Sequence, residues 1–142
     1  MTSKEITYDQ LEAAIRIAFL NHRDIFKFYD KNVIVTNLDE LSNDIMEKIK
    51  GYPEAKFMAI YEKDKLIGYF VYMDGTLISF GLNVEYRVRK SLRDFFKHIK
   101  KTIKGRFYCT LWSRNIRAVK YLMKQGMQII DTNPHITKLV NP

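Results

Sequence analysis

The chain has 142 residues, of which 46% are hydrophobic and 13% aromatic, and its formal net charge is +8. This length predicts a single domain, residues 1–142, and the apolar content excludes a disordered chain. No apolar run reaches the ~18–20 residues that span a bilayer, and the first residues show no secretory signal. One cysteine, Cys109, excludes an internal disulfide and a multi-cysteine zinc site, and the three histidines have no metal-ligand spacing. These features favour a protein of a reducing cytoplasm with no membrane span and no metal.

Two helices are predicted in the first third of the chain. Residues Thr7–Gln10 have the form of a capping box, and apolar residues then recur at helical spacing over 11–19. A second helix is predicted over 38–50, where Asn37 caps its start and Gly51 closes it in a left-handed conformation. The apolar positions of each helix form one stripe, so each helix is expected to bury one face.

An antiparallel meander is predicted next. Its strand-like runs are residues 57–61, 66–73 and 76–82. Asp74–Gly75 is the strongest hairpin signal in the chain and joins the second run to the third. Tyr69 and Tyr72 fall on opposite faces of the second run, so at most one of them lines any cleft.

A helix, a strand, a second helix and a terminal hairpin are predicted in that order after the meander. The ranges are a helix within 87–106 that ends at Gly105, a strand at 107–112, a helix at 115–125 and short strands near 127–130 and 136–139. The strand is reached from the meander through a helix, so it is expected to run parallel to the strand before it. Gly126 is the expected C′ residue of the helix at 115–125. The whole pattern predicts a mixed α/β layer fold.

The positive charge of the chain is concentrated in one segment. Residues 87–106 contain one acidic residue, Asp94, and nine basic residues: Arg87, Arg89, Lys90, Arg93, Lys97, Lys100, Lys101, Lys104 and Arg106. The segment therefore carries +8, while the 15 basic and 15 acidic residues of the rest of the chain balance. Such a segment attracts the phosphates of a nucleotide cofactor, a nucleic acid or a membrane surface. The alternative is a solvated helix face without a partner.

The pattern after residue 112 resembles motif B of the GNAT acyltransferases. Asn115, Ala118 and Gly126 stand at the family's spacing after a strand, and Met127 supplies the apolar residue that follows the glycine. With the preceding meander, the resemblance covers residues 56–130. It implies a GNAT-like fold in which the strands flanking the basic helix splay into a cleft, and an N-acetyltransferase that uses acetyl-CoA.

In this family, a loop and a helix N-terminus cradle the pyrophosphate of acetyl-CoA. Residues 83–87 resemble the start of that loop, but Val88, Lys90 and Leu92 stand where the family has glycines. Nearby basic side chains are expected to compensate by charge. The candidate cofactor-binding residues are Leu82, Val84, Arg87, Arg89, Lys90, Ser91, Leu92, Arg93 and Asn115.

The family's catalytic residues are not matched. The tyrosine that serves as general acid on the motif B helix is replaced by Leu122, and the neighbouring Tyr121 is expected to pack in the core. No carboxylate lies in residues 76–82 to act as general base, which leaves Glu85, Ser79 or a water molecule. No catalytic residue is therefore assigned, and weak or absent catalysis is expected.

A narrower resemblance covers residues 76–130. Small GNAT-like proteins of tailed bacteriophages, including an internal virion protein of podoviruses, are similar in having a Lys/Arg-rich helix in place of the glycine loop. This implies a phage-encoded protein of the bacterial host cytoplasm or the virion, with a virion or host protein as partner. Three functions stay open: an acetyl-CoA-dependent N-acetyltransferase, a non-catalytic virion or accessory binding protein, and a phosphate or nucleic-acid binder acting through the basic helix.

Overall fold

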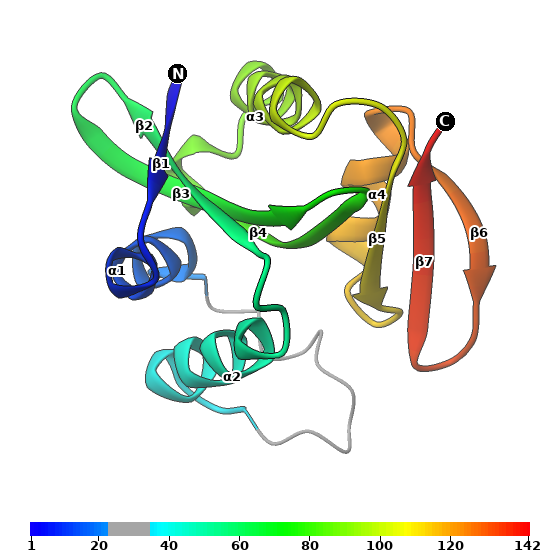
Figure 1. The fold of residues 1–142 in the computed structure, drawn as a ribbon, viewed down its shortest axis with the longest axis horizontal. Helices are drawn as coiled ribbons and strands as arrows, with labels where there is room; N and C mark the ends of the chain where they lie inside the picture. The colour runs from blue at the N-terminus through cyan, green and yellow to red at the C-terminus, as the bar shows by residue number, and fades with distance from the viewer. Residues whose placement is uncertain (23–34) are drawn as a thin grey trace.

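The computed structural model describes residues 1–22 and 35–142 (Figure 1). In this part of the chain, one seven-stranded sheet has the order β1-β2-β3-β4-β5-β7-β6. The strands are β1 (Thr2–Ile6), β2 (Lys56–Glu62), β3 (Lys65–Met73), β4 (Thr76–Leu82), β5 (Phe107–Trp112), β6 (Gln128–Thr132) and β7 (Ile136–Asn141). The helices are α1 (Tyr8–Phe19), α2 (Leu38–Lys50), α3 (Arg89–Thr102) and α4 (Ile116–Lys124), and a 3-10 turn, η2 (Val84–Tyr86), precedes α3. The predicted mixed α/β sheet with its meander and terminal hairpin is confirmed.

Helices cover both faces of the sheet. Figure 1 shows α1 and α2 on one face and α3 on the other. Successive residues of β3 therefore enter different cores, because side chains alternate along a strand. Tyr69 and Val71 pack in the core under α1 and α2, whereas Phe70 packs with Phe95 of α3 in the second core. None of the described helices is long and apolar enough to cross a membrane.

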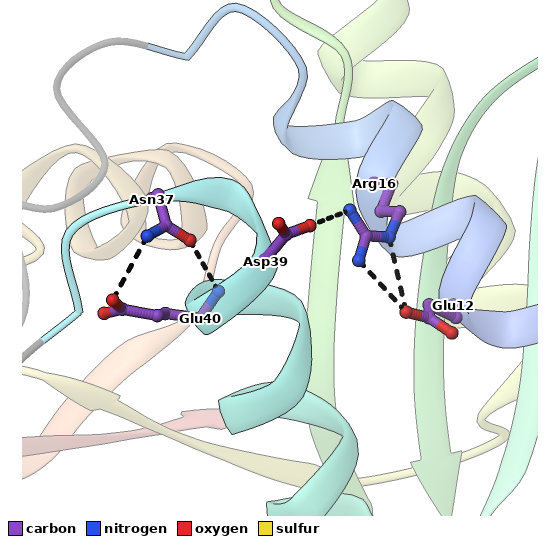
Figure 2. A network of polar contacts seen from close by, with 5 residues as sticks. All are labelled: Glu12, Arg16, Asn37, Asp39 and Glu40. Carbon is purple, nitrogen blue, oxygen red and sulfur yellow. Dashed lines mark hydrogen bonds and ion pairs between the residues drawn. The ribbon is translucent and has the colours of Figure 1, made fainter.

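Polar contacts join α1 to α2 and fix the start of α2 (Figure 2). The Arg16 guanidinium of α1 donates to Asp39 of α2 at 2.6 Å and to Glu12 one turn earlier at 3.2 Å. The Asn37 side chain accepts the backbone N–H of Glu40 at 2.9 Å, which satisfies a donor that a helix start leaves open. The two helices thus form one layer over the sheet.

Three features differ from the sequence prediction. Helix α3 ends at Thr102 with Ile103 as its cap, three residues before the predicted Gly105. Gly51 has φ −71° and ψ −5°, so the predicted left-handed closure of α2 is wrong. The chain instead continues α2 as a right-handed turn, in which the N–H of Tyr52 donates to the carbonyl of Ile49 at 2.9 Å. Strand β1 was not predicted, because its sequence is mainly polar and only its pairing with the outer side of β2 makes it a strand.

Strands β4 and β5 pair only where they begin. They are parallel, as predicted, and the register joins Thr76 to Tyr108 and Leu77 to Cys109. Beyond these two pairs β4 continues to Leu82 without a partner on its β5 side. On its other edge, β5 pairs with β7 along its whole length. The predicted splaying of the two strands is confirmed, and it opens the sheet at its centre.

Candidate cofactor cleft

A cavity of about 630 Å³ lies where β4 and β5 diverge, and it is called the cleft below. Its walls include residues 78–82 of β4 and residues 110–112 of β5. Helices α1 and α2 contribute walls from one face of the sheet, and α3 and α4 contribute walls from the other. The cleft therefore passes between the two strands and is bordered by elements of both faces.

Packing of β4 against α1 sets one wall of the cleft. A Cβ on Gly81 would lie 2.9 Å from the Phe19 ring and 3.0 Å from Ala18 and from the Tyr69 ring. Glycine at this position lets the strand come close to the helix. The backbone of residues 78–82 then faces the cleft on the side that β5 has left, where a ligand can form the hydrogen bonds of a missing strand.

Hydrogen bonds of Asn83 hold the loop at residues 83–88, which follows β4. Its backbone N–H donates to the carbonyl of Ile67 at 2.8 Å, and its side chain donates to the carbonyl of Ile17 in α1 at 2.8 Å. Its side-chain oxygen also accepts the N–H of Glu85 at 3.0 Å, which starts the 3-10 turn. The loop is thus tied to both β3 and α1.

The N–H groups of this loop are used within the loop itself. Tyr86 donates to the carbonyl of Asn83 at 2.9 Å, and Arg87 donates to that of Val84 at 3.3 Å. A glycine-rich phosphate nest would instead leave such groups free for a ligand. The N–H groups that a ligand can use are those of the first turn of α3. The N-cap residue of this helix, Val88, makes no side-chain hydrogen bond to them.

The Arg87 side chain turns back into the cleft. Its Nε donates to the carbonyl of Leu82 at 2.7 Å, and one terminal nitrogen lies 3.4 Å from Nε2 of His22. Loss of solvation and the nearby charge of Arg117 both lower the pKa of this guanidinium. No acidic residue lines the cleft among the residues that the structure describes, whereas Lys48, Arg87 and Arg117 all do. The described part of the cleft wall thus holds three cationic side chains, of which Lys48 also pairs with Asp44 at 3.1 Å.

The predicted cofactor residues fall into two groups. Four of them line the cleft: Leu82, Arg87, Leu92 and Asn115. The Asn115 side chain accepts the N–H of Ala118 at 3.3 Å and so caps α4 at the cleft wall. The other five lie outside the wall: Val84 and Ser91 are half-buried, and Arg89, Lys90 and Arg93 are exposed on α3 or at its start.

Tyr121 has a second role besides the predicted core packing. Its ring lies 6.2 Å from that of Phe80 and 6.4 Å from that of Phe96, within the second core. It also borders the cleft, where its hydroxyl donates to the carbonyl of Leu92 at 2.7 Å. Burial raises the pKa of this hydroxyl, which makes it harder to deprotonate. Leu122 is fully buried and does not line the cleft.

Of the two side chains considered as general base, Ser79 lines the cleft and Glu85 does not. Glu85 is exposed, lies 3.9 Å from Lys65 and does not line the cleft. Ser79 does line it, and its Oγ lies 2.7 Å from the hydroxyl of Tyr69. Tyr69 borders the cleft and Tyr72 does not, as the alternation along β3 predicted. Burial raises the pKa of Tyr69, so this hydroxyl pair is neutral at physiological pH.

Sequence reasoning missed Lys48 of α2 and two further basic residues of the cleft wall, His22 and Arg117. His22 follows α1, is buried and stacks on Phe19 with ring centroids 6.4 Å apart. Arg117 lies in the first turn of α4. Neither belongs to the basic segment 87–106, and neither stands at a motif position, so only the folded arrangement brings them to Arg87.

No protein-family model matches the sequence, and a search of curated proteins gives no match. An acetyltransferase from Thermus thermophilus aligns with 15% identity and a TM-score of 0.70, over 100% of this chain and 97% of its own. A GNAT-family acetyltransferase from Streptococcus pneumoniae aligns with 14% identity and a TM-score of 0.56, over 99% and 97%. The PaiA N-acetyltransferase from Thermoplasma acidophilum, solved in complex with coenzyme A, aligns with 17% identity and a TM-score of 0.59, over 99% of both chains.

These alignments span nearly the full length of each chain at low sequence identity, so they bear on the fold. The fold expected from the resemblance of residues 56–130 is confirmed by them. The protein has the fold of the GNAT acetyltransferases.

Proposed function

We propose that this protein binds acetyl-CoA in the cleft and is a GNAT-type N-acetyltransferase with weak or absent catalysis. The observation that carries the proposal is the divergence of β4 from β5 after Leu77, which opens a cavity of about 630 Å³ beside the start of α3. A coenzyme A complex of the Thermoplasma acidophilum neighbour supports the choice of ligand.

The pantetheine arm is expected to lie along residues 78–82 of β4, whose backbone has no strand partner on the β5 side. The pyrophosphate is expected at the first turn of α3, near the N–H groups of Arg89, Lys90 and Ser91. The exposed side chains of Arg89, Lys90 and Arg93 add positive charge there. In this proposal, charge replaces the glycine nest.

Acetyl transfer requires an amine to attack the thioester carbonyl and the thiolate to leave with a proton. No carboxylate lines the described part of the cleft, and the hydroxyls of Ser79 and Tyr69 already bond to each other. The hydroxyl of Tyr121 already donates to Leu92. Without an acid or base, the rate enhancement comes mainly from holding the amine and the thioester close together. Slow acetyl transfer is therefore expected.

Calorimetric titration and thermal unfolding with acetyl-CoA test the cofactor proposal. Ligand at 100 times its Kd stabilises a folded protein by about 2.7 kcal/mol, so a clear rise in Tm is expected. Absence of both heat and a Tm shift at millimolar acetyl-CoA would contradict the proposal. If the cofactor binds and no acetyl transfer to amines is detected, the non-catalytic binding protein is the better interpretation of the same cleft.

A second candidate function is binding of phosphate groups or nucleic acid through residues 87–106. The exposure of the cations favours it: Arg89, Lys90, Arg93, Lys97, Lys100, Lys101, Lys104 and Arg106 are all exposed. Binding that weakens as salt rises is the expected result.

A phage origin, a location in the host cytoplasm or the virion, and a virion or host protein as partner are further parts of the GNAT-type proposal. They rest on the resemblance of residues 76–130. Mass spectrometry of purified virions tests them.

A further inference from the structure

The exposed side of α3 is made only of cations. The six exposed residues of the helix are Arg89, Lys90, Arg93, Lys97, Lys100 and Lys101, which we call the basic arc. At about 100° per residue, all six fall within about 120° of the helix circumference. The buried residues Phe95 and Ile99 lie about 140–180° from the middle of this arc, Phe96 lies beside its edge, and all three pack in the second core. The arc therefore points away from the protein.

The charge of the basic arc is not neutralised by the described protein surface. No carboxylate of the described residues lies within 4.0 Å of any of its six cations. Some cations on other elements do pair with a carboxylate, namely Arg16, Lys48, Lys50 and Lys65. Asp94, the one acidic residue of α3, is half-buried. The arc is thus a concentrated positive surface rather than a network of ion pairs.

The cations extend along the whole helix, so the arc can contact several phosphates of one duplex. From Arg89 to Lys101 the helix rises about 18 Å at ~1.5 Å per residue, with about one cation every 3–4 Å. One strand of a nucleic-acid duplex presents a phosphate about every 3.4 Å along the axis. Because α3 is packed on a sheet, the backbone positions of the cations are fixed before any partner binds. Binding then orders the long side chains and not the helix itself.

The chemistry of the basic arc also limits what it can recognise. It carries no aromatic side chain on which an unpaired base stacks, which single-strand binders use. It carries no asparagine or glutamine to read adenine edges. It has no exposed apolar face to enter a membrane, because the apolar face of α3 is packed on the sheet.

We infer that the basic arc binds the phosphate backbone of double-stranded nucleic acid without reading its sequence. The inference deepens the second candidate function and rests on it. None of the six residues lines the cleft, but Arg89, Lys90 and Arg93 are also the cations proposed for the pyrophosphate of acetyl-CoA. A duplex would therefore share the first turn of α3 with the cofactor, and Lys97, Lys100 and Lys101 are the part of the arc that serves the duplex alone.

The test uses the full chain and a labelled 30-base-pair DNA duplex, with fluorescence anisotropy between 25 and 200 mM NaCl. The variant K97Q/K100Q/K101Q removes three cations of the arc that lie away from the start of α3. The matched control, K4Q/K56Q/K63Q, removes three exposed lysines from β1, β2 and the turn after β2, so both variants have the same net charge. Glutamine has nearly the helix propensity of lysine, and circular dichroism checks that both variants fold.

The expected result is duplex binding that weakens steeply with salt and is equal, within twofold, for a second duplex of unrelated sequence. The arc variant should lower the slope of log K against log salt by about 2.7, since each phosphate contact contributes about 0.9. The control should leave the slope unchanged.

Three outcomes would overturn the inference. Tighter binding to a 30-nucleotide single strand, or to phosphatidylserine vesicles, would assign the arc to another partner. Equal effects of the two variants would show that net charge, not the arc, is responsible. Absence of binding to any nucleic acid at 25 mM NaCl would remove the second candidate function itself, while acetyl-CoA binding, measured separately, would remain unaffected.

Discussion

The Nε of Arg87 donates a 2.7 Å hydrogen bond to the backbone carbonyl of Leu82, the last residue of β4. This bond links the loop after β4 to the end of that strand. It also places the guanidinium in the cleft, 3.4 Å from Nε2 of His22. The carbonyl of Leu82 is thereby satisfied by the protein. A loop without glycine is in this way held in one conformation by a side chain.

Arg87→Gln should lower the free energy of unfolding by about 1–2 kcal/mol, because a charged hydrogen bond to a buried backbone carbonyl is lost. The decrease is limited, since the substitution also relieves the repulsion from Arg117. Urea unfolding measures the change. Arg114→Gln, at an exposed position outside the cleft wall, is the control and should be neutral. Equal stability of the two variants would show that the Arg87 bond contributes nothing to holding the loop.

Tyr69→Phe and Ser79→Ala should be coupled in a double-mutant cycle. The two hydroxyls lie 2.7 Å apart, and Tyr69 is fully buried, so each single variant leaves the other hydroxyl without its partner. The expected coupling free energy is about 0.5–1.5 kcal/mol by urea unfolding. Strictly additive effects would mean that the two groups do not depend on each other in solution.

Cys109 makes stability fall at alkaline pH. Burial raises the pKa of its thiol from 9.0 to about 12, so the unfolded chain loses its proton at lower pH than the folded chain. The contribution is therefore fully present below pH 9 and is lost as the pH rises from 9 toward 12. Compared with Cys109→Ala, the wild-type protein should lose about 1.4 kcal/mol more between pH 8 and pH 10. The ionisation of exposed lysines is common to both proteins, so parallel pH profiles would contradict the burial of the thiol.

The predictable part of the fold depends on local sequence signals. Asp74–Gly75 marked the hairpin into β4, and Gly126, at φ +103°, ends α4 where a left-handed residue was expected. Hydrophobic periodicity located both helices of the first layer and α3. Together these signals were sufficient to place β5 parallel to β4, and the family resemblance added the expectation that the two strands separate.

The missed features depend on contacts between distant residues. Strand β1 is a strand only because β2 lies beside it. The direction of Arg87 depends on where the 3-10 turn leaves its backbone, which no periodicity encodes. His22 and Arg117 are separated from Arg87 by many residues, so sequence position gave no reason to group them.

The three cations at the start of α3 should contribute to acetyl-CoA affinity. R89Q/K90Q/R93Q should weaken acetyl-CoA binding by about tenfold or more, because a loss of about 1.4 kcal/mol in phosphate contacts corresponds to a factor of ten. Binding of S-acetylpantetheine, which has no phosphate, should not change. Calorimetry measures both ligands, and K4Q/K56Q/K63Q controls for net charge. Equal losses for the two ligands would mean that these side chains do not act on the phosphates.

Backbone hydrogen exchange with and without acetyl-CoA is the sharpest test of the proposed cofactor site, because it locates the ligand on the chain. We expect slower exchange at residues 78–82 of β4 and at residues 89–91, the first turn of α3, with no change in β6 or in its hairpin with β7. Slower exchange confined to other elements, or no change at residues 78–91 under saturating acetyl-CoA, would contradict the proposal that the splayed strands hold the cofactor.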